Sequence, residues 1–387
     1  MHVTRLDLRQ LRRFDEVTLA PGSGLNLITG DNGAGKTSVL EGLHLMAYGR
    51  SFRGRVRDGL VRAGHPALEV FVQWQERVPA GPGRVDAGRA DAPAAAPRLR
   101  KAGLRHSGQG WSGRLDGNAV AHLGELCAAL AVVSFDPGSH ILVSGGGEPR
   151  RRFLDWGLFH VEQDFLGLWR RYSRALRQRN ALLKSRASGG QLDAWDHELA
   201  EAGEPLTRAR EAYLDALAPH YTALLADLVP GVGLGSLRYA PGWRRDEMSL
   251  ADALLLNRDR DLASGHTSAG PHRADWALAF AGLPGREALS RGQAKLTALA
   301  ALLAQAEHYA AQRGEWPVVA LDDLASELDR SHQRRVLERL LASGAQVFVT
   351  GTEAPPALTG WDAGPMHVFH VKHGTVEAGD TAGPAVP

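Results

Sequence analysis

The chain of 387 residues has almost no cysteine, since Cys127 is the only one. A single cysteine cannot form a disulfide within the chain, and it excludes zinc sites built from several cysteines. No run of about 18 uncharged apolar residues is present, and the first residues alternate in polarity without the apolar core of a secretion signal. We therefore expect a cytoplasmic protein that does not enter a membrane.

An excess of charge of one sign is also missing, because 45 basic and 43 acidic residues leave a formal net charge of +2. This balance neither indicates nor excludes a nucleic-acid partner. The basic residues are five lysines and forty arginines. Arginine suits phosphate and carboxylate recognition, but an arginine bias can also follow from genome composition, so it carries little weight. The hydrophobic content of 44% is that of an ordinary globular protein.

One of the few lysines lies in the most informative segment, residues 30–37, which fits the pattern G-x-x-x-x-G-K-[ST]. An apolar run at 25–29 precedes it and a helix-like run at 37–47 follows it. In this context the backbone N–H groups of the loop and the positive end of the helix surround nucleotide phosphates. The sequence therefore predicts an ATP site that comprises Gly30, Asp31, Asn32, Gly33, Ala34, Gly35, Lys36, Thr37 and Ser38.

Two further features give this site its expected chemistry. Lys36 is placed to reach the β- and γ-phosphates, and Thr37 to bind Mg²⁺. At 318–321 four apolar residues, typical of a buried parallel strand, run into Asp322 and Asp323. Carboxylates at the end of such a strand point into the site. We expect Asp322 to bind Mg²⁺ with Thr37, and Asp323 to orient or deprotonate the attacking water.

Two short segments near the acidic strand end at 318–323 resemble further motifs of ABC-type ATPases, and they occur in the same order along the chain. Residues 289–295 (Leu-Ser-Arg-Gly-Gln-Ala-Lys) resemble the signature of ABC-type ATPases, and 326–329 resemble the loop called the D-loop, with Ser326 and Asp329. Ser290 is predicted to be a helix N-cap whose hydroxyl faces a γ-phosphate, together with Arg291, Gly292 and Gln293. The long separation of this signature from the phosphate loop resembles SMC-like repair ATPases more than transporters.

Over nearly its full length the chain resembles the RecF family of bacterial recombination mediators. The stretches that carry this resemblance are residues 11–14, 30–37, 49–53, 135–137, 151–155, 177–184, 270–273 and 289–329. The resemblance implies an α/β fold, an SMC-like ABC-type ATPase head with mixed sheets around the phosphate loop and an inserted, mainly helical arm. We expect the head at 1–150 and 264–387, with a flexible insertion at 77–97, and the arm at 151–263.

The same resemblance implies a function. Arg12 would contact ATP, and the signature of one copy would cap the nucleotide of another, so that ATP drives formation of a homodimer. Members of the family bind double-stranded and gapped DNA and help RecO and RecR to load RecA onto single strands. Neither the spacing nor the composition of the sequence shows these partners.

DNA binding requires a basic surface, and two segments offer one. One helix carries seven basic residues with no acidic residue among them: Arg170, Arg171, Arg174, Arg177, Arg179, Lys184 and Arg186. Arg170, Arg174 and Arg177 recur at helical spacing and share a face. The turn after the first helix carries Arg50, Arg53, Arg55 and Arg57. The alternative is a solvated helix face or pairing of these arginines within the molecule. His272, in Gly-Pro-His-Arg, is either a site residue or part of a structural turn.

Departures from the usual ABC pattern leave two other functions open. Asp323 stands where a glutamate is usual, which predicts slow hydrolysis, and no switch histidine or Q-loop glutamine is evident; residues 350–352 (Thr-Gly-Thr) occupy the switch position. A clamp that binds ATP without turnover therefore remains possible. An ATPase subunit of a transporter or another assembly is the second alternative, although such a subunit predicts a switch histidine.

Overall fold

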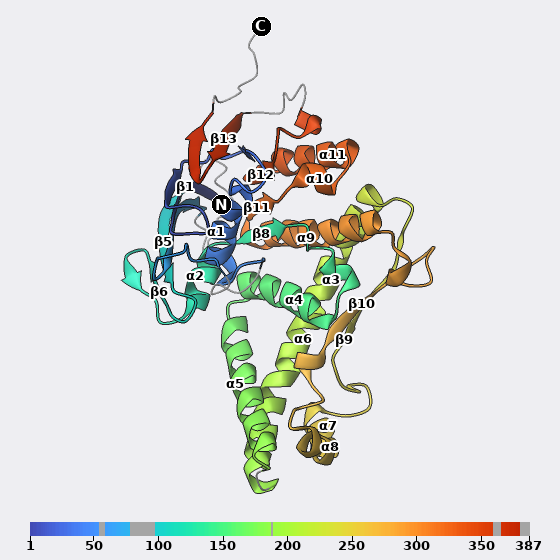
Figure 1. The fold of residues 1–387 in the computed structure, drawn as a ribbon. Helices are drawn as coiled ribbons and strands as arrows, with labels where there is room; N and C mark the ends of the chain where they lie inside the picture. The colour runs from blue at the N-terminus through green and yellow to red at the C-terminus, as the bar shows by residue number, and fades with distance from the viewer. Residues whose placement is uncertain (54–58, 78–96, 187–188, 359–364, 380–387) are drawn as a thin grey trace, which may run out of the picture. The chain divides into compact units, whose positions relative to one another are not determined.

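The computed structural model describes residues 1–53, 59–77, 97–186, 189–358 and 365–379. The chain forms two compact units, one made of Met1–Gly138 and Tyr309–Pro387 and the other of Ser139–His308 (Figure 1). Arg55, Arg57 and most of the expected insertion at 77–97 lie outside the described residues. No helix of the described segments combines the length and the apolar character that crossing a bilayer requires.

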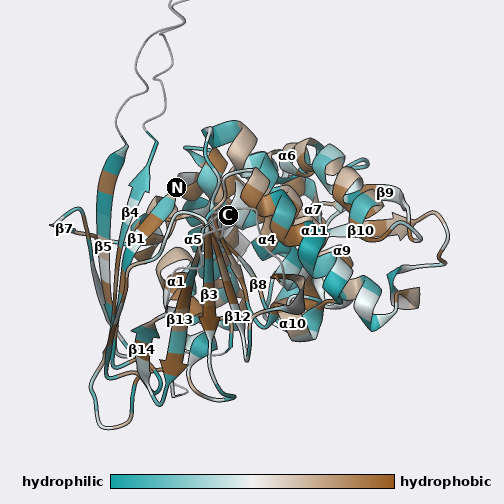
Figure 2. Cartoon of the chain, turned by 90° about the horizontal axis from the view of Figure 1, so that it is seen from above, coloured by the Kyte–Doolittle hydropathy of each residue, from teal (hydrophilic) through white to brown (hydrophobic). Residues whose placement is uncertain are grey.

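The first unit contains a largely parallel sheet in the order β14-β13-β3-β12-β11-β8, counted over the described strands. Every residue of β3, β11 and β12 is buried, and Figure 2 shows the hydrophobic colouring of β3 and β12. Such continuous apolar runs are expected of strands covered on both faces. The strands are β3 Leu25–Thr29, β8 Val132–Phe135, β11 Val318–Leu321, β12 Val347–Gly351, β13 Met366–Lys372 and β14 Thr375–Ala378.

A second sheet of this unit is antiparallel, with its described strands in the order β2-β1-β4-β5-β6-β7. In β1 and β4 buried and exposed residues alternate, because one face of the sheet packs on the core and the other meets solvent. The strands are β1 His2–Arg9, β2 Glu16–Leu19, β4 Leu68–Glu76, β5 Arg98–His106, β6 Trp111–Leu115 and β7 Asn118–Ala119. Helix α1, Lys36–Tyr48, contacts strands of both sheets and is buried over most of its length. The other helices of this unit are α2 Leu123–Ala129, α10 Leu324–Glu327, α11 Arg330–Ala342 and the short η3 Pro356–Leu358.

The second unit is mainly helical. Its helices α5, Phe165–Lys184, and α6, Gly189–Leu228, lie side by side (Figure 1). The remaining helices are α3 Ile141–Ser144, α4 Gly147–Val161, α7 Leu250–Leu256, α8 Arg258–Ser264, η1 Pro271–Arg273 and η2 Arg286–Ala288. Helix α9, Arg291–Arg313, belongs to this unit up to His308, and its last turn belongs to the first unit. Tyr172 and Ala175 of α5 are buried, as expected for the apolar stripe of an amphipathic helix.

The structure corrects one expectation about this unit. Within the mainly helical arm expected at 151–263, Leu234–Ala240 forms strand β9, which pairs antiparallel with β10, Asp275–Phe280. A short strand of this kind is stabilised by its distant partner rather than by its own sequence. The pair also joins residues on the two sides of the expected boundary at 263, so the compact units differ from the head and arm expected from the sequence. The assignment of 264–308 to the head stays a prediction.

Candidate nucleotide-binding site

Three neighbouring strands of the parallel sheet end at one edge. Strand β12 lies between β3 and β11, with Thr350 opposite Ile28 and Val349 opposite Leu321. Because parallel strands present their carboxyl ends together, the residues that follow them meet in one place. The phosphate loop follows β3, Asp322 follows β11, and Thr350 is the next-to-last residue of β12.

The loop between β3 and α1 has a backbone that only glycine adopts easily. Gly30 has a φ of 147°, and a Cβ atom there would stand 2.2 Å from the carbonyl oxygen of Val371. Gly35 has a φ of 122° and precedes α1 without a side-chain cap on the helix. No side chain therefore covers the positive end of the helix, where an anion binds favourably, and the N–H of Ser38 donates to the carbonyl oxygen of Gly35 at 2.8 Å.

Lys36 and Thr37 begin α1 and point in different directions. The Lys36 ammonium group donates to the carbonyl oxygens of Gly30 and Asp31 at 2.7 and 2.9 Å, so it folds back over the loop. The Thr37 hydroxyl donates to Oδ1 of Asp322 at 2.9 Å. The two residues predicted to bind Mg²⁺ are thus brought together from positions far apart in the sequence.

Asp322 is buried and accepts two hydroxyl groups. Besides Thr37, the Thr350 hydroxyl donates to Oδ1 of Asp322 at 2.6 Å, and the same hydroxyl accepts the backbone N–H of Asp323 at 2.8 Å. Burial raises the pKa of Asp322 above its usual value, and the hydrogen bonds from Thr350 and Thr37 act in the opposite direction. Thr350 was not among the site residues predicted from the sequence.

A pocket of about 850 Å³ opens beside these groups, and each of its described lining residues belongs to the first unit. Three arginines line it, which suits the charge of a triphosphate. Arg12 was predicted there, Arg53 was assigned to DNA, and Arg13 was not assigned. The lining residues are Arg12, Arg13, Asn32, Gly33, Gly35, Lys36, Thr37, Ser38, Phe52, Arg53, Asp136, Pro137, Gly138, Asp322, Asp323 and Thr350. Gly30, Asp31 and Ala34, also predicted to contact ATP, are not among them.

A buried carboxylate on α1 holds two parts of the pocket wall. Glu41, fully buried, accepts two hydrogen bonds from the guanidinium group of Arg12 at 2.8 and 3.0 Å. The hydroxyl of Ser51 also donates to Glu41 and accepts the backbone N–H of Arg53. Glu41 therefore links Arg12 to the turn that carries Arg53, and sequence reasoning gave no sign of this role.

Asp323 and the predicted D-loop follow in a short helical turn. Asp323 has a φ of 52°, a left-handed conformation that aspartate tolerates better than most residues. The Ser326 hydroxyl donates to its Oδ2 at 2.5 Å. Asp329 caps α11 by accepting the N–H groups of Ser331 and His332, and the His332 N–H lowers the pKa of Asp329 to about 2.

The predicted signature forms the start of α9 in the second unit. The Ser290 hydroxyl accepts the N–H of Gln293 at 3.2 Å, and the Gln293 side chain accepts the N–H of Ser290 at 2.9 Å. This reciprocal pair is a capping box, so the predicted N-cap is confirmed. Ser290, Arg291 and Gly292 are exposed at this helix end.

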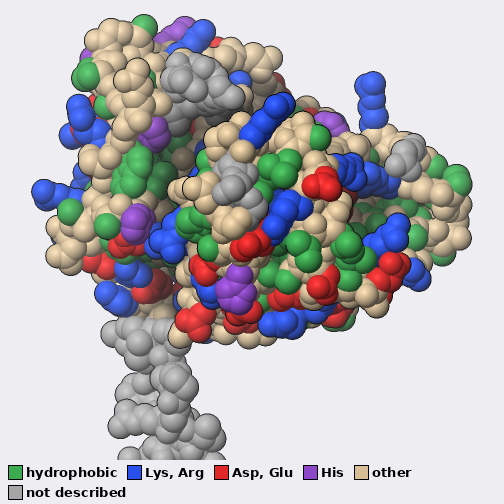
Figure 3. Space-filling view, turned by 90° about the horizontal axis from the view of Figure 1, so that it is seen from below, with side chains coloured by type: hydrophobic (Ala, Val, Ile, Leu, Met, Phe, Trp, Pro, Cys, Tyr) green, Lys and Arg blue, Asp and Glu red, His purple; other side chains and the backbone are tan. Residues whose placement is uncertain are grey.

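The arginines of α5 divide into two groups. Arg171 pairs with Glu198, and Arg179 is fully buried in ion pairs, so the alternative of pairing within the molecule holds for both. Arg174 and Arg177 are exposed and Arg170 is half-buried. On the face that Figure 3 shows, basic side chains are interspersed with acidic ones rather than gathered in a single patch.

His272 belongs to a structural turn of the second unit. Its ring contacts the Tyr172 hydroxyl at 2.7 Å and the Thr267 carbonyl oxygen at 2.9 Å. Burial lowers the pKa of His272 to about 4, so the ring is neutral at neutral pH. Both ring nitrogens are engaged within the protein, which favours the structural alternative of the two considered.

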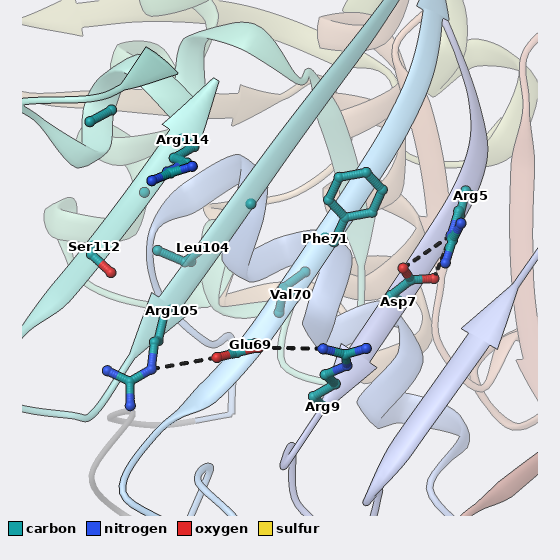
Figure 4. A pocket seen from close by; sticks show the side chains of 13 residues that line it. Arg5, Asp7, Arg9, Glu69, Val70, Phe71, Leu104, Arg105, Ser112 and Arg114 are labelled. Carbon is teal, nitrogen blue, oxygen red and sulfur yellow. Dashed lines mark hydrogen bonds and ion pairs between the residues drawn. The ribbon is translucent and has the colours of Figure 1, made fainter. Parts of the chain in front are cut away.

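A second pocket lies on the outer face of the antiparallel sheet (Figure 4). Arg5 pairs with Asp7 there, and both Arg9 and Arg105 lie near Glu69. The first pair lies within β1 and the other two join neighbouring strands, and together they compensate most of the charge of the arginines they involve. The pocket beside the phosphate loop therefore remains the stronger candidate for an anionic ligand.

The parallel sheet, the G-x-x-x-x-G-K-T loop, the acidic strand end and the separate signature helix define an SMC-like, ABC-type ATPase fold. The family model described as "RecF/RecN/SMC N terminal domain" matches residues 2–375. The chain belongs to this family, and within it to the RecF proteins.

Similar proteins agree with this assignment over the full length. The DNA replication and repair protein RecF of Stenotrophomonas maltophilia (strain R551-3) is 66% identical, covering 98% of this chain and 100% of the relative. That of Thioalkalivibrio sulfidiphilus (strain HL-EbGR7) is 39% identical with the same coverage. A solved structure of the recombination mediator protein RecF-ATP in the RecFOR pathway has a TM-score of 0.83 and 25% identity, covering 98% of each chain. An Smc head bound to a ScpA domain, 15% identical with a TM-score of 0.57 and covering 100% of this chain and 98% of that one, shares the fold.

Proposed function

We propose that this protein is an ATP-dependent DNA-binding protein of recombinational repair. ATP joins two copies head to head on DNA at gaps and junctions, and slow hydrolysis releases them. In this role the protein assists RecO and RecR in loading RecA onto single strands. The support for this comes from the 66% identical relative, described as a DNA replication and repair protein, and from the similar structure described in the RecFOR pathway.

The pocket beside the loop accounts for the triphosphate. Lys36 and the positive N-terminal end of α1 bind phosphate oxygens, and Arg12, Arg13 and Arg53 add positive charge around them. Thr37 and Asp322 offer a hydroxyl and a carboxylate oxygen 2.9 Å apart, the kind of oxygen donors that Mg²⁺ takes together with phosphates. These residues therefore fit Mg²⁺, which would neutralise charge on the phosphates when bound.

In hydrolysis, Asp323 is proposed to act on the attacking water. Its carboxylate orients or deprotonates the water that attacks the γ-phosphate. The side chain is one methylene shorter than glutamate, and Ser326 already donates to it at 2.5 Å, which supports slow turnover. A clamp without turnover is the alternative that the same observation favours, and a phosphate-release assay with and without DNA distinguishes the two.

The main support for the dimer is that the phosphate pocket and the signature helix, the two elements expected to bind nucleotide, belong to different units of the chain. The phosphate pocket is lined by described residues of the first unit, whereas Ser290 caps a helix of the second unit and is exposed. An exposed helix N-terminus attracts an anion. In a symmetric dimer the Ser290 end of each copy would cap the phosphates held by the other.

Replacing Ser290 with arginine should abolish the ATP-dependent dimer. The larger cationic side chain would occupy the position of the cap and repel the arginines of the partner's pocket, and we expect dimer affinity to fall by at least about 100-fold. Light scattering with and without ATP and Mg²⁺ measures this effect. The control is Ser112→Arg, at an exposed position of β6. If Ser290→Arg still dimerises as the unmodified protein does, the proposed sandwich is wrong.

Duplex DNA should bind in a strongly salt-dependent way, because the expected contacts are to phosphates. Changing Arg170, Arg174 and Arg177 to glutamine should weaken binding without changing sequence preference. Each lost phosphate contact lowers the slope of log affinity against log salt by about one. Fluorescence anisotropy across a salt series checks this, with Arg244→Gln as the control, since Arg244 is exposed and paired with Glu247. If binding does not depend on salt, or if the unmodified protein and the glutamine variant have equal slopes, α5 does not contact DNA phosphates.

A further inference from the structure

Thr350, the first residue of the Thr-Gly-Thr segment at the switch position, occupies the central position of the site. It stands near the end of β12, between the strand that leads into the phosphate loop and the strand that ends at Asp322. Its side chain is buried, with a residue exposure of 1%. Its hydroxyl donates its one proton to Oδ1 of Asp322 at 2.6 Å and accepts the N–H of Asp323 at 2.8 Å.

These two bonds hold one carboxylate, that of Asp322, and the backbone of the next aspartate, Asp323. The first bond, with that from Thr37, holds the Asp322 carboxylate in one orientation. The second holds the backbone of Asp323, which has the uncommon left-handed φ of 52°. Asp323 stands at the N-cap position of α10 without a side-chain cap, and its Oδ2 accepts the Ser326 hydroxyl, so the placement of its carboxylate depends on this backbone position together with Ser326. The Thr350 hydroxyl therefore contributes to the relative placement of a magnesium-binding oxygen and of the group that acts on water.

We propose that Thr350 is a positioning residue for ATP hydrolysis, in the position where other ABC-type ATPases carry a switch histidine. This inference rests on the proposed function. Thr350 does not need to contact the nucleotide. It acts through Asp322 and Asp323, as an outer hydrogen-bonding partner orients a metal ligand.

The test compares Thr350→Val, which keeps the shape and loses the hydroxyl, with Thr350→Ser, which keeps the hydroxyl. Steady-state phosphate release gives kcat and KM, and a fluorescent ATP analogue gives nucleotide affinity as a function of Mg²⁺ concentration. For Thr350→Val we expect kcat to fall by about 10–100-fold. The Mg²⁺ concentration that supports half-maximal nucleotide binding should rise by about 10-fold, with affinity at saturating Mg²⁺ little changed. Thr350→Ser should restore both quantities to near those of the unmodified protein.

The matched control is Thr18→Val, at an exposed position of β2, which should change neither quantity. Equal kcat for Thr350→Val and the unmodified protein overturns the inference and leaves the proposed function intact. So does an equal loss for Thr350→Ser and Thr350→Val, since the hydroxyl would then not be the cause. If the unmodified protein itself neither binds nor hydrolyses ATP, the proposed function fails, and the inference fails with it.

Discussion

Replacing Lys36 with methionine is expected to weaken ATP binding by at least about 100-fold, which corresponds to a loss of roughly 3 kcal/mol of charge-assisted interaction. Methionine keeps the length and apolar stem of lysine but has no charge and no donor. In the structure the ammonium group lies over the loop, on the carbonyl oxygens of Gly30 and Asp31. It is therefore already within the loop that would hold the phosphates, and a triphosphate provides oxygens that compete for it.

Titration calorimetry with ATP and Mg²⁺ measures this effect. Lys101→Met, at an exposed position of β5, is the control for the loss of one positive charge. The fold should persist in both variants, because the partners of Lys36 among the described residues are two carbonyl oxygens of its own loop, and circular dichroism checks this. ATP affinity within about threefold of the unmodified protein for Lys36→Met would mean that the loop does not hold the phosphates.

The parts of this site that the sequence predicts are the local ones. A strand covered on both faces is a continuous apolar run, so β3 and β11 could be located, and with them the loop and the acidic pair that follow. The carboxyl ends of parallel strands lie at the same edge of a sheet. For this reason the sequence alone predicts that Thr37 and Asp322 lie close together. Their hydroxyl–carboxylate distance of 2.9 Å agrees with that expectation.

The parts that escaped prediction depend on order in space. Thr350 lies in the site because β12 is placed between β3 and β11 in the sheet. The sequence of residues 347–351 does not indicate which strands will flank β12. Glu41 reads as an ordinary polar position of α1, yet it is fully buried against Arg12. A carboxylate so far from water needs partners, and here they are Arg12, which precedes the phosphate loop, and Ser51, in the turn directly after α1.

The sequence was also insufficient to predict the environment of individual arginines. Composition and spacing could not distinguish those that contact solvent from those paired inside the protein. Arg53, expected on DNA, lines the phosphate pocket. Arg179, in the same basic stretch as Arg174 and Arg177, is fully buried. The sign of a charge can be read from a sequence, whereas the position of its partner requires the fold.

Removing Asp261 is expected to destabilise the second unit by up to about 3–5 kcal/mol, because the buried Arg179 guanidinium group would lose one of its two carboxylate partners. The Arg179 guanidinium group donates to Asp261 at 2.6 Å, to Asp196 at 2.5 Å and to the Thr267 hydroxyl at 2.9 Å. The side chains of Arg179 and Asp261 have no exposed surface. Asp261→Ala would therefore leave Arg179 too far from water to recover its solvation.

The effect should appear as loss of protection in α5 and α8, the helices that this cluster joins. Amide hydrogen exchange is the appropriate measurement, because two compact units need not unfold in one step. Glu247→Ala is the matched control. It removes an acidic residue from the exposed pair with Arg244, and such pairs contribute less than about 1 kcal/mol.

A double variant separates the loss of the charge partner from the loss of packing. Arg179→Met with Asp261→Ala removes the stranded charge, while Asp196 keeps its second partner, Arg258, at 2.5 Å. The double variant should therefore lose at least about 1 kcal/mol less than the sum of the two single variants. Strict additivity would contradict this account, because it would mean that the two side chains stabilise the unit independently and that their pairing contributes nothing. The turn at residues 270–273 should also lose protection from amide exchange, since the Thr267 carbonyl oxygen contacts His272 of this turn at 2.9 Å.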